Sequence, residues 1–367
     1  MFDYKSFYLW NPVKIIYGKR KVSEIYNYIS GKNVLLIADP IMVKMGYANK
    51  LTNQFENVHV FDKVEPNPSC DLINKIHEEY KYNEIELVIG LGGGSSLDIA
   101  KALSGLLPCG GRIEEYIEGK KFTKRTKLVL IPSTAGTGSE VTNVGVYTVA
   151  GIKKPMTSDY FWADISVVDP ELTYSMPPRI TMYTGLDALT HAIESYWALS
   201  TQPYTEGLAL RAAKMILESL EKSIEGEEWA RNEMMIASTI AGVAFSQTRT
   251  TAAHAISFPL TSFYNIEHGL ACALTLPELL LFNYEKIKTK MDEMLFYLGM
   301  THVQELSSKI ISLINKSGCS TKLKDYGVRK EDLEKIAQEA MKASIIKLTP
   351  RDIEHEDVLK ILNRVYE

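Results

Sequence analysis

The feature that most constrains the fold is a change of pattern near residue 178. Before it, short apolar runs alternate with stretches whose apolar residues recur at helical intervals. Four apolar runs predict strands: VLLIAD (34–39), VHVFD (58–62), LVIGLGGG (87–94) and KLVLIPST (127–134). Continuous apolar strands that alternate with helices are typical of a parallel sheet covered on both faces. The first part of the chain therefore predicts an open α/β architecture of the dinucleotide-binding kind.

The remainder of the chain has a different pattern. Beyond MPPR (176–179) the strand signals fade, and long amphipathic segments follow. Pro177 and Pro178 mark the change, since proline interrupts a strand ladder or a helix interior. At 367 residues the chain also exceeds the usual size of one hydrophobic core. We predict two domains: residues 1–178 form an α/β dinucleotide-binding domain with a mostly parallel sheet, and residues 179–367 form an all-helical, metal-binding domain.

Composition narrows the class of partner. The chain is 46% hydrophobic and 23% charged, which is ordinary for an ordered globular protein. A formal charge of -4 gives no general attraction to nucleic acid or to acidic membrane surfaces, so a small molecule is the expected partner. The four cysteines have no disulfide-framework spacing, and neither a signal peptide nor a membrane-spanning run is recognisable. We therefore expect a cytoplasmic protein.

A glycine-rich run follows the third predicted strand. Gly92, Gly93, Gly94, Ser95 and Ser96 come directly after LVIGL and lead into a predicted helix. Glycines permit close backbone approach, serine hydroxyls can donate, and a helix N-terminus carries partial positive charge. The run predicts a site for the pyrophosphate of a dinucleotide. The alternative is a tight strand-to-helix turn that binds nothing.

A second loop, STAGTGS at residues 133–139, follows the fourth predicted strand. It offers the hydroxyls of Ser133, Thr134 and Thr137 beside two glycines, although a hydroxyl-rich turn would look the same. Two such loops at neighbouring strand ends could hold one dinucleotide between them. Neither loop has the G-x-G-x-x-G spacing, which argues against a standard Rossmann unit.

Two aspartates lie near these predicted loops. Asp39 ends the first strand, where its carboxylate could accept hydrogen bonds from the adenosine ribose and would disfavour the extra phosphate of NADP. Asp39 could equally cap the turn before Pro40. Asp98 lies near the start of the predicted helix, a position that suits a carboxylate with or without a ligand. The sequence therefore favours NAD over NADP and leaves structural roles open for both residues.

The strongest chemical signal is a set of four residues in the helical part. Asp187 and His191 are four positions apart in GLDALTHAIESY, so they share one helix face. His254 is expected at the end of a long apolar helix, and a proline-containing turn is expected between it and His268. One carboxylate with three imidazoles suits Fe²⁺ or Zn²⁺ better than Mg²⁺ or Ca²⁺. A single buried histidine is more often structural, but four convergent candidates predict a metal site.

At these residues the chain resembles the iron-containing, or group III, alcohol dehydrogenases, a family that includes lactaldehyde reductase, butanol dehydrogenase and 1,3-propanediol dehydrogenase. The resemblance runs from NPVKIIYG to about residue 300, and four motifs carry it: GGGSSLDIAKA, IPSTAGTGSEVT, GLDALTHAIESY and HAISFPLTSFYNIEHG. It implies a dehydroquinate-synthase-like fold, an α/β dinucleotide domain followed by an all-helical domain, with the active site in the cleft between them. It also implies a homodimer or a higher homo-oligomer.

The resemblance assigns roles to individual residues. It implies that Asp187, His191, His254 and His268 hold the metal, with Fe²⁺ expected and Zn²⁺ as the alternative. The dinucleotide contacts that it implies are Asp39, Asn67, Gly94, Ser95, Thr134, Thr137 and Lys154. The loops and the helix start add Gly93, Asp98 and Ser133 as candidate contacts. Many members carry a further histidine where this chain has Phe258, so proton relay through that imidazole is not expected. We expect Phe258 instead to shape a more apolar pocket.

These features together predict a metal-dependent enzyme that transfers a hydride between NAD(H) and a small primary alcohol, diol or aldehyde. Three alternatives are a lyase of the dehydroquinate synthase type, an enzyme of the glycerol dehydrogenase type, and a binding module without turnover. A lyase of that type requires several cationic side chains for a phosphate substrate. Residues 181–200 and 254–276, around the predicted metal site, contain no Lys or Arg, which favours the alcohol dehydrogenase.

Overall fold

The computed structural model describes residues 6–367, which form two compact units. Residues 11–175 make the first, here called the α/β unit. Residues 176–367, together with the segment 6–10, make the second, here called the helical unit. The sequence predicted the division after residue 178, where Pro178 begins the first long helix of the helical unit.

The α/β unit is built on one six-stranded sheet in the order β1-β8-β5-β4-β2-β3. All five strand pairs are parallel, so the predicted fold class is confirmed for this unit. The strands are β1 (Lys14–Tyr17), β2 (Asn33–Ala38), β3 (Asn57–Phe61), β4 (Leu87–Gly92), β5 (Lys127–Pro132) and β8 (Ile165–Val168). A separate antiparallel hairpin joins β6 (Val144–Val149) to β7 (Ile152–Thr157).

The sequence predicted the four longer strands of the six-stranded sheet, β2, β3, β4 and β5. β2, β4 and β5 are almost wholly buried, because helices cover both faces of a parallel sheet. Only four residues make up β1, and three of them are exposed, so it lacks a continuous apolar run. The equally short β8 and the half-exposed hairpin were also not predicted. Hydrogen bonding to neighbouring strands, and not an apolar pattern of their own, defines these four strands.

Five helices accompany this sheet: α1 (Pro40–Lys44), α2 (Tyr47–Thr52), α3 (Cys70–Tyr80), α4 (Gly94–Cys109) and α5 (Ile113–Ile117). The Ser69 hydroxyl caps α3 by accepting a hydrogen bond from the Leu72 N–H. Every residue of α4 from Ser96 to Leu106 is buried, so this helix lies inside the unit. Its first residue follows β4 after Gly93 alone, which leaves the N-terminus of α4 at the carboxyl edge of the sheet.

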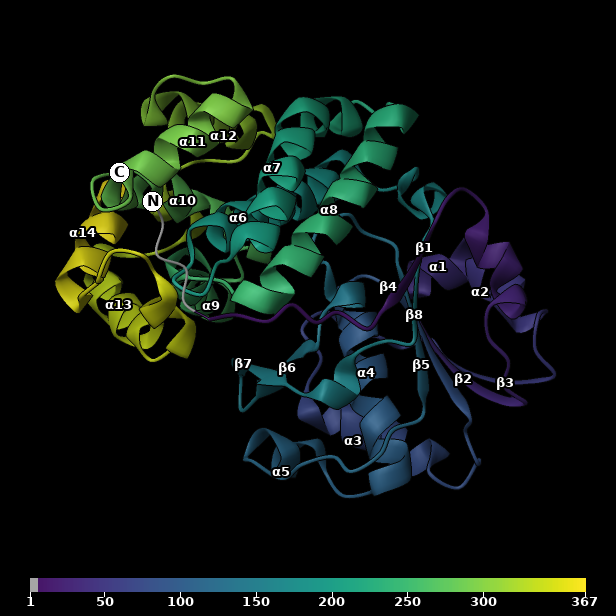
Figure 1. Cartoon of the computed structure of the whole chain (residues 1–367). Coiled ribbons are helices and arrows are strands. Elements are labelled where there is room, and N and C mark those ends of the chain that lie inside the picture. Colours follow the sequence, from purple (N-terminus) through teal and green to yellow (C-terminus); the bar gives the residue numbers. More distant parts are fainter. Residues whose placement is uncertain (1–5) are drawn as a thin grey trace. The chain divides into compact units, whose positions relative to one another are not determined.

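The described residues of the helical unit contain no strand, as the sequence predicted. Its helices are α6 (Pro178–Trp197), α7 (Pro203–Ile224), α8 (Glu228–Thr248), α9 (Ala252–Tyr264), α10 (His268–Tyr284), α11 (Lys288–Leu298), α12 (Val303–Lys316), α13 (Leu333–Met341) and α14 (His355–Tyr366). Figure 1 shows α7 and α8 side by side, and both pack on α6. Helix α10 packs on α6 and α9, and these three helices carry the predicted metal ligands. Within residues 6–367, no helix combines the length and apolar character needed to cross a membrane.

Two local expectations for the helical unit were wrong. Helix α8 ends at Thr248, and His254 lies in the first turn of the next helix, α9, instead of at the end of the preceding one. The expected proline, Pro259, lies inside α9, and the turn between α9 and α10 (residues 265–267) contains none. This turn begins at Asn265, which adopts the left-handed conformation (φ 53°). Most of α9 is buried, Pro259 included, and its tertiary contacts outweigh the hydrogen bond that a proline removes.

Candidate metal centre and dinucleotide loops

Helix α6 supplies the first two candidate metal ligands. Asp187 and His191 are one turn apart and both are buried, with exposed fractions of 3% and 5%. The Oδ1 atom of Asp187 lies 3.9 Å from Nδ1 of His191. The predicted convergence of these two side chains on one helix face is therefore present.

The other two histidines come from α9 and α10, and a glycine allows the required approach. A Cβ atom added at Gly269 would lie 1.9 Å from the backbone oxygen of Tyr183 in α6. Only glycine therefore fits where the start of α10 packs on α6. This close packing holds His268, the first residue of α10, within reach of Asp187.

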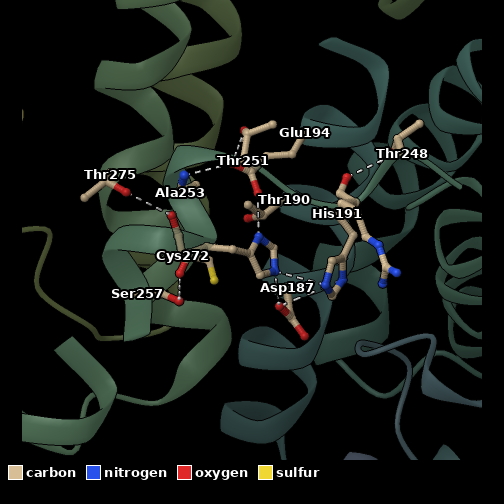
Figure 2. Close-up of polar contacts among 12 residues, drawn as sticks. Asp187, Thr190, His191, Glu194, Thr248, Thr251, Ala253, Ser257, Cys272 and Thr275 are labelled. Carbon is tan, nitrogen blue, oxygen red and sulfur yellow. Dashed lines mark hydrogen bonds and ion pairs between the residues drawn. The ribbon is translucent and has the colours of Figure 1, made fainter. Parts of the chain in front are cut away.

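Three of the four predicted ligands, Asp187, His254 and His268, converge, and His191 adjoins them. The Nε2 atoms of His254 and His268 lie 3.6 Å and 4.0 Å from Oδ1 of Asp187. His191 joins them because its Nε2 lies 2.9 Å from Nε2 of His254. Figure 2 shows Asp187 and His191 directed toward the same region from α6. Two ring nitrogens that face each other this closely can share a proton or face one cation.

Hydrogen bonds assign the tautomers of two of the histidines. His254 Nδ1 lies 2.6 Å from Oε2 of Glu194, and a carboxylate accepts, so Nδ1 carries the proton. The Ser257 hydroxyl donates to the backbone oxygen of His254, which leaves its oxygen to accept from Nδ1 of His268 at 3.3 Å. In both rings Nε2 then presents a lone pair toward Asp187, as metal ligation requires.

Glu194 contacts the candidate ligand His254 and was not among the site residues predicted from the sequence. It is fully buried and accepts hydrogen bonds from the Thr251 hydroxyl, the Ala253 N–H and the His254 ring (Figure 2). Burial acts to raise its pKa, but the hydrogen bond from His254 and further donors outweigh burial and lower the pKa. A signal existed, since Glu194 follows His191 by three positions and therefore lies near its face of α6.

Cys272 was also missed. Its sulfur, one nitrogen each of His254 and His268, and one oxygen of Asp187 all lie within 4.8 Å of one another. The side chain is fully buried, and Figure 2 shows it beside Asp187. Cys272 follows His268 by four positions, the same spacing as Asp187 and His191, so the helical face of α10 could have revealed it.

The donor set fits a divalent transition-metal ion. Among residues 6–367, Oδ1 of Asp187 is a buried carboxylate oxygen that accepts no hydrogen bond, although imidazole nitrogens surround it. Leaving such an oxygen unsatisfied is costly unless a cation satisfies it. A carboxylate, imidazoles and a neighbouring thiol match the borderline preferences of Fe²⁺ and Zn²⁺.

Phe258 lies on α9 one turn after His254 and is partly exposed. Its ring is nearly parallel to that of His268, at 11° with 6.3 Å between centroids. A phenyl ring offers no proton to pass on. The position therefore suits an apolar wall beside His268, the role that the sequence predicted for it.

In the α/β unit, the first glycine loop brings the backbone of β4 to the N-terminus of α4. Gly92 adopts φ 151°, and a Cβ there would lie 2.5 Å from the hydroxyl oxygen of Ser96. Gly93, the N-cap of α4, has ordinary φ and only distant neighbours, since a Cβ would approach Thr134 Cγ2 at 3.6 Å. The Ser96 hydroxyl is buried without a hydrogen-bond partner in the described part of the chain. Free helix-end amides and an orphaned hydroxyl fit a phosphate group.

The second loop packs directly against the first. The Ser133 N–H donates to the backbone oxygen of Gly92 at 2.9 Å, which ties the end of β5 to that of β4. Thr134 flanks Gly93, and Thr137 flanks Gly94, where a Cβ would lie 3.0 Å from Thr137 Cγ2. The hydroxyl-bearing residues of the two predicted loops are thus neighbours at one edge of the sheet.

Asp98 has internal partners. Its carboxylate accepts from the Ser139 hydroxyl at 2.7 Å and from the Val146 N–H at 2.9 Å. Lys101, fully buried, donates to Ser139 Oγ at 2.7 Å and to the backbone oxygen of Val144 at 2.7 Å. Burial raises the pKa of Asp98 and lowers that of Lys101 to about 8, with each group opposing the shift of the other. These contacts favour the structural alternative for Asp98, a brace between α4 and the second loop.

The remaining predicted dinucleotide contacts lie around these loops. Asp39 is the N-cap of α1, and its side chain accepts from the Ile41 N–H at 2.8 Å. The Asn67 N–H donates to the Ser95 hydroxyl at 3.2 Å, so these two predicted residues are neighbours. Lys154 is exposed on β7. The capping role that the sequence left open for Asp39 is therefore present, and one carboxylate oxygen is used for it.

Two family profiles cover almost the whole chain. "Iron-containing alcohol dehydrogenase" matches residues 12–170, and "Fe-containing alcohol dehydrogenase family, C-terminal" matches residues 181–366. A long-chain-alcohol dehydrogenase from Geobacillus thermodenitrificans is 33% identical over 85% of this chain and 84% of its own. A sulfoacetaldehyde reductase from Bilophila wadsworthia is 32% identical over 99% of this chain and all of its own length (100%).

Solved structures agree with this relationship. The crystal structure of sulfoacetaldehyde reductase from Bifidobacterium kashiwanohense in complex with NAD⁺ superposes with a TM-score of 0.93. It is 32% identical to this chain and the match covers 98% of this chain and 99% of that one. The α/β unit and the helical unit together have the architecture of this NAD⁺-binding reductase. The chain belongs to the iron-containing alcohol dehydrogenase family, which confirms the predicted family, fold and reaction class.

Proposed function

We propose that this chain is an NAD(H)-dependent reductase of small aldehydes, and dehydrogenase of the matching primary alcohols, that uses one divalent ion. We assign the ion to Asp187, His191, His254 and His268, with Fe²⁺ preferred and Zn²⁺ as the alternative. The observation that carries the proposal is the buried Asp187 oxygen, which three imidazoles surround and no described hydrogen-bond donor satisfies. The NAD⁺ named for the Bifidobacterium structure supports the choice of cofactor.

The residues of the metal centre would hold one divalent ion and fix its position in the helical unit. A divalent ion held there supplies Lewis acidity toward an alcohol or aldehyde oxygen. Glu194 fixes the His254 ring through Nδ1, and Ser257 does the same for His268, so both Nε2 atoms stay directed inward. Phe258 presents an apolar ring beside His268 and limits the access of water to this side of the site.

We assign the dinucleotide to the two loops of the α/β unit. Bound NAD(H) supplies the hydride donor or acceptor. The amides at the start of α4 and the hydroxyls of Ser95, Thr134 and Thr137 provide donors for the pyrophosphate. We propose that Asp39 uses its remaining carboxylate oxygen for the ribose diol, which selects NAD over NADP. Asn67 and Lys154 are proposed at the rim of this site on the family resemblance.

We also propose which partners the chain has. A small alcohol or aldehyde is the substrate, and no nucleic acid or membrane takes part. The names of the two sulfoacetaldehyde reductases and of the long-chain-alcohol dehydrogenase support aldehydes and primary alcohols as the substrate class. We retain assembly into a homodimer or higher homo-oligomer, and a cytoplasmic location, as predictions from the sequence.

One assay tests the function. The protein is purified without oxygen and loaded with Fe²⁺ or Zn²⁺, and NADH absorbance is followed with butanal. We expect oxidation of NADH that requires the aldehyde, disappears with a chelator and returns when the ion is restored. Full activity after removal of the ion would contradict the proposal, and so would the absence of aldehyde-dependent turnover with either ion.

A further inference from the structure

One residue near the metal centre has a backbone conformation that its side chain disfavours. Arg249 follows α8 directly and adopts φ 65° and ψ -179°. Glycine populates this region of backbone space readily, whereas residues with a Cβ atom pay a conformational cost. A glycine at this position would satisfy the backbone at no cost. The arginine therefore calls for an explanation that involves its side chain.

The backbone on both sides of Arg249 is fastened to α6. The Thr248 hydroxyl donates to the backbone oxygen of Arg249 at 2.9 Å and lies 3.0 Å from the Ser195 hydroxyl. Two positions after Arg249, the Thr251 hydroxyl donates to Glu194 and accepts from the Trp197 indole N–H at 3.0 Å. These contacts fix the unusual conformation and hold Arg249 in one place.

The guanidinium of Arg249 has no counter-charge. Among residues 6–367 it makes no hydrogen bond and no ion pair, and no acidic group perturbs it. Burial alone lowers its pKa, which shows that the cation has lost part of its hydration without gaining a partner. Because a guanidinium offers five donors in a planar fork, it is a ready site for an anion.

The position of Arg249 connects it to the metal centre. Its backbone N–H donates to the oxygen of Phe245 at 2.8 Å, one turn earlier in α8. The ring of Phe245 stacks on the ring of His191, with 4.2 Å between centroids and 12° between planes. Arg249 thus follows Phe245, which covers the candidate ligand His191. It precedes a second candidate ligand, His254, by five positions.

We propose that Arg249 binds the anionic group of the substrate, so that the enzyme acts on aldehydes that carry a carboxylate or a sulfonate. This proposal rests on the proposed function and names the substrate class for the same site. The aldehyde carbon accepts a hydride from NADH and its oxygen accepts one proton, which yields the hydroxy anion and NAD⁺. The carboxylate or sulfonate itself is unchanged and pairs with the guanidinium through charge-assisted hydrogen bonds.

The segments that carry the candidate ligands supply no cation of their own, since residues 181–200 and 254–276 contain no Lys or Arg. Arg249 precedes the second of these segments by five positions. A single guanidinium suits an oxyanion with one negative charge and does not balance a phosphate ester with two. The sequence reasoning overlooked Arg249 because it considered only the neighbours of the ligands along the chain.

The test compares substrates of different charge. The metal-loaded enzyme is assayed with NADH and succinic semialdehyde, sulfoacetaldehyde or butanal. We expect kcat/KM for at least one anionic aldehyde to exceed that for butanal, and the ratio to fall by about 10- to 100-fold in Arg249→Met, as expected for loss of a charge-assisted pair. Arg249→Lys should retain part of the ratio. Arg211→Met, which removes an exposed arginine from α7, is the matched control and should leave the ratio unchanged.

A binding measurement separates this inference from the proposed function. Titration calorimetry with 4-hydroxybutanoate and 2-hydroxyethanesulfonate, the alcohols of the two anionic aldehydes, requires no turnover. It therefore reads the anion site even if the enzyme reduces none of the aldehydes. We expect the wild type to bind at least one of them and Arg249→Met to bind it at least about tenfold more weakly. Equal binding by both proteins, or none by the wild type, would overturn the proposal. So would a change confined to melting temperature or to NADH affinity, which would assign Arg249 to the end of α8 or to the dinucleotide.

Discussion

The two candidate sites are built from different materials. In the helical unit, side chains from α6, α9 and α10 converge in a buried cluster, and Asp187, His191 and His254 are each at most 5% exposed. In the α/β unit, the site consists mainly of backbone at the ends of β4 and β5, where glycines leave room for a ligand. Residue identity determines the first site, while backbone conformation determines the second. Single substitutions should therefore affect the two sites in different ways.

The largest effect is expected from His268→Ala, because it removes one of four ligands without filling the space. We expect metal-dependent turnover to fall by about 10³-fold or more, since Lewis-acid assistance contributes several kcal/mol. The affinity for NADH should change by less than about twofold, because the loops belong to the other unit. Metal content by mass spectrometry and NADH fluorescence titration measure the two quantities. Turnover that survives with full metal content would remove His268 from the ligand set.

The α/β unit should respond through its backbone. Gly92→Ala places a Cβ at φ 151° and 2.5 Å from Ser96 Oγ, so we expect a loss of about 2–5 kcal/mol in the free energy of unfolding. Gly93→Ala is the matched control for the fold, since its Cβ meets only an ordinary contact at 3.6 Å. That variant should fold normally and bind NADH more weakly, because a phosphate approaches the backbone there. Urea unfolding of both variants measures the backbone strain at residue 92, and NADH titration measures the obstruction of the phosphate at residue 93. Equal stability of the two proteins would contradict the role assigned to Gly92.

Much of both sites could be predicted because some signals are local. Periodicity along one helix is enough to place Asp187 beside His191, and a glycine run after an apolar strand is enough to indicate a loop that meets a helix N-terminus. The breaks around His254 could not be predicted in the same way. The run SQTRTT (246–251) between the apolar parts of α8 and α9 is wholly polar, but composition alone does not separate a polar helix turn from a break. The break at Arg249 depends on hydrogen bonds to α6, such as that between Thr248 and Ser195.

The residues that the sequence analysis missed fall into two kinds. Some matter only through tertiary contacts, and others are of a residue type that was not considered as a ligand. Glu194 matters because Thr251 and His254 come to it from another helix, across 60 positions in the case of His254. Cys272 was considered only for disulfides, although it shares a helix face with His268. Asp98 is the opposite case: the sequence left a ligand contact and a structural role open for it, and the structure places the Ser139 hydroxyl and the Val146 N–H as donors to its two oxygens.

A subtler test of the helical unit is Glu194→Gln, which keeps the size of the side chain and removes its charge. We expect metal affinity to fall by about 10- to 100-fold, because the carboxylate that orients and polarises the His254 ring is lost. Glu225→Gln, an exposed position at the end of α7, should leave metal affinity unchanged. Competition with a chromogenic chelator gives both affinities. An unchanged affinity in Glu194→Gln would show that Glu194 serves only to anchor the loop before α9.

The smallest effect is expected at Asp39, where one carboxylate has two possible roles. Asp39→Ser retains an N-cap for α1, because a serine hydroxyl can accept from the Ile41 N–H as the aspartate does. It removes the negative charge that would repel the additional phosphate of NADP, a repulsion of about 1–2 kcal/mol for charges at a solvated site. The preference for NADH over NADPH, measured as a ratio of kcat/KM, should therefore fall by about 5- to 30-fold. Asp39→Ala removes cap and charge together and should shift the ratio equally while lowering the melting temperature further. If both variants lose stability in proportion to the cap and neither changes the ratio, Asp39 belongs to the fold of the α/β unit and not to its selection of cofactor.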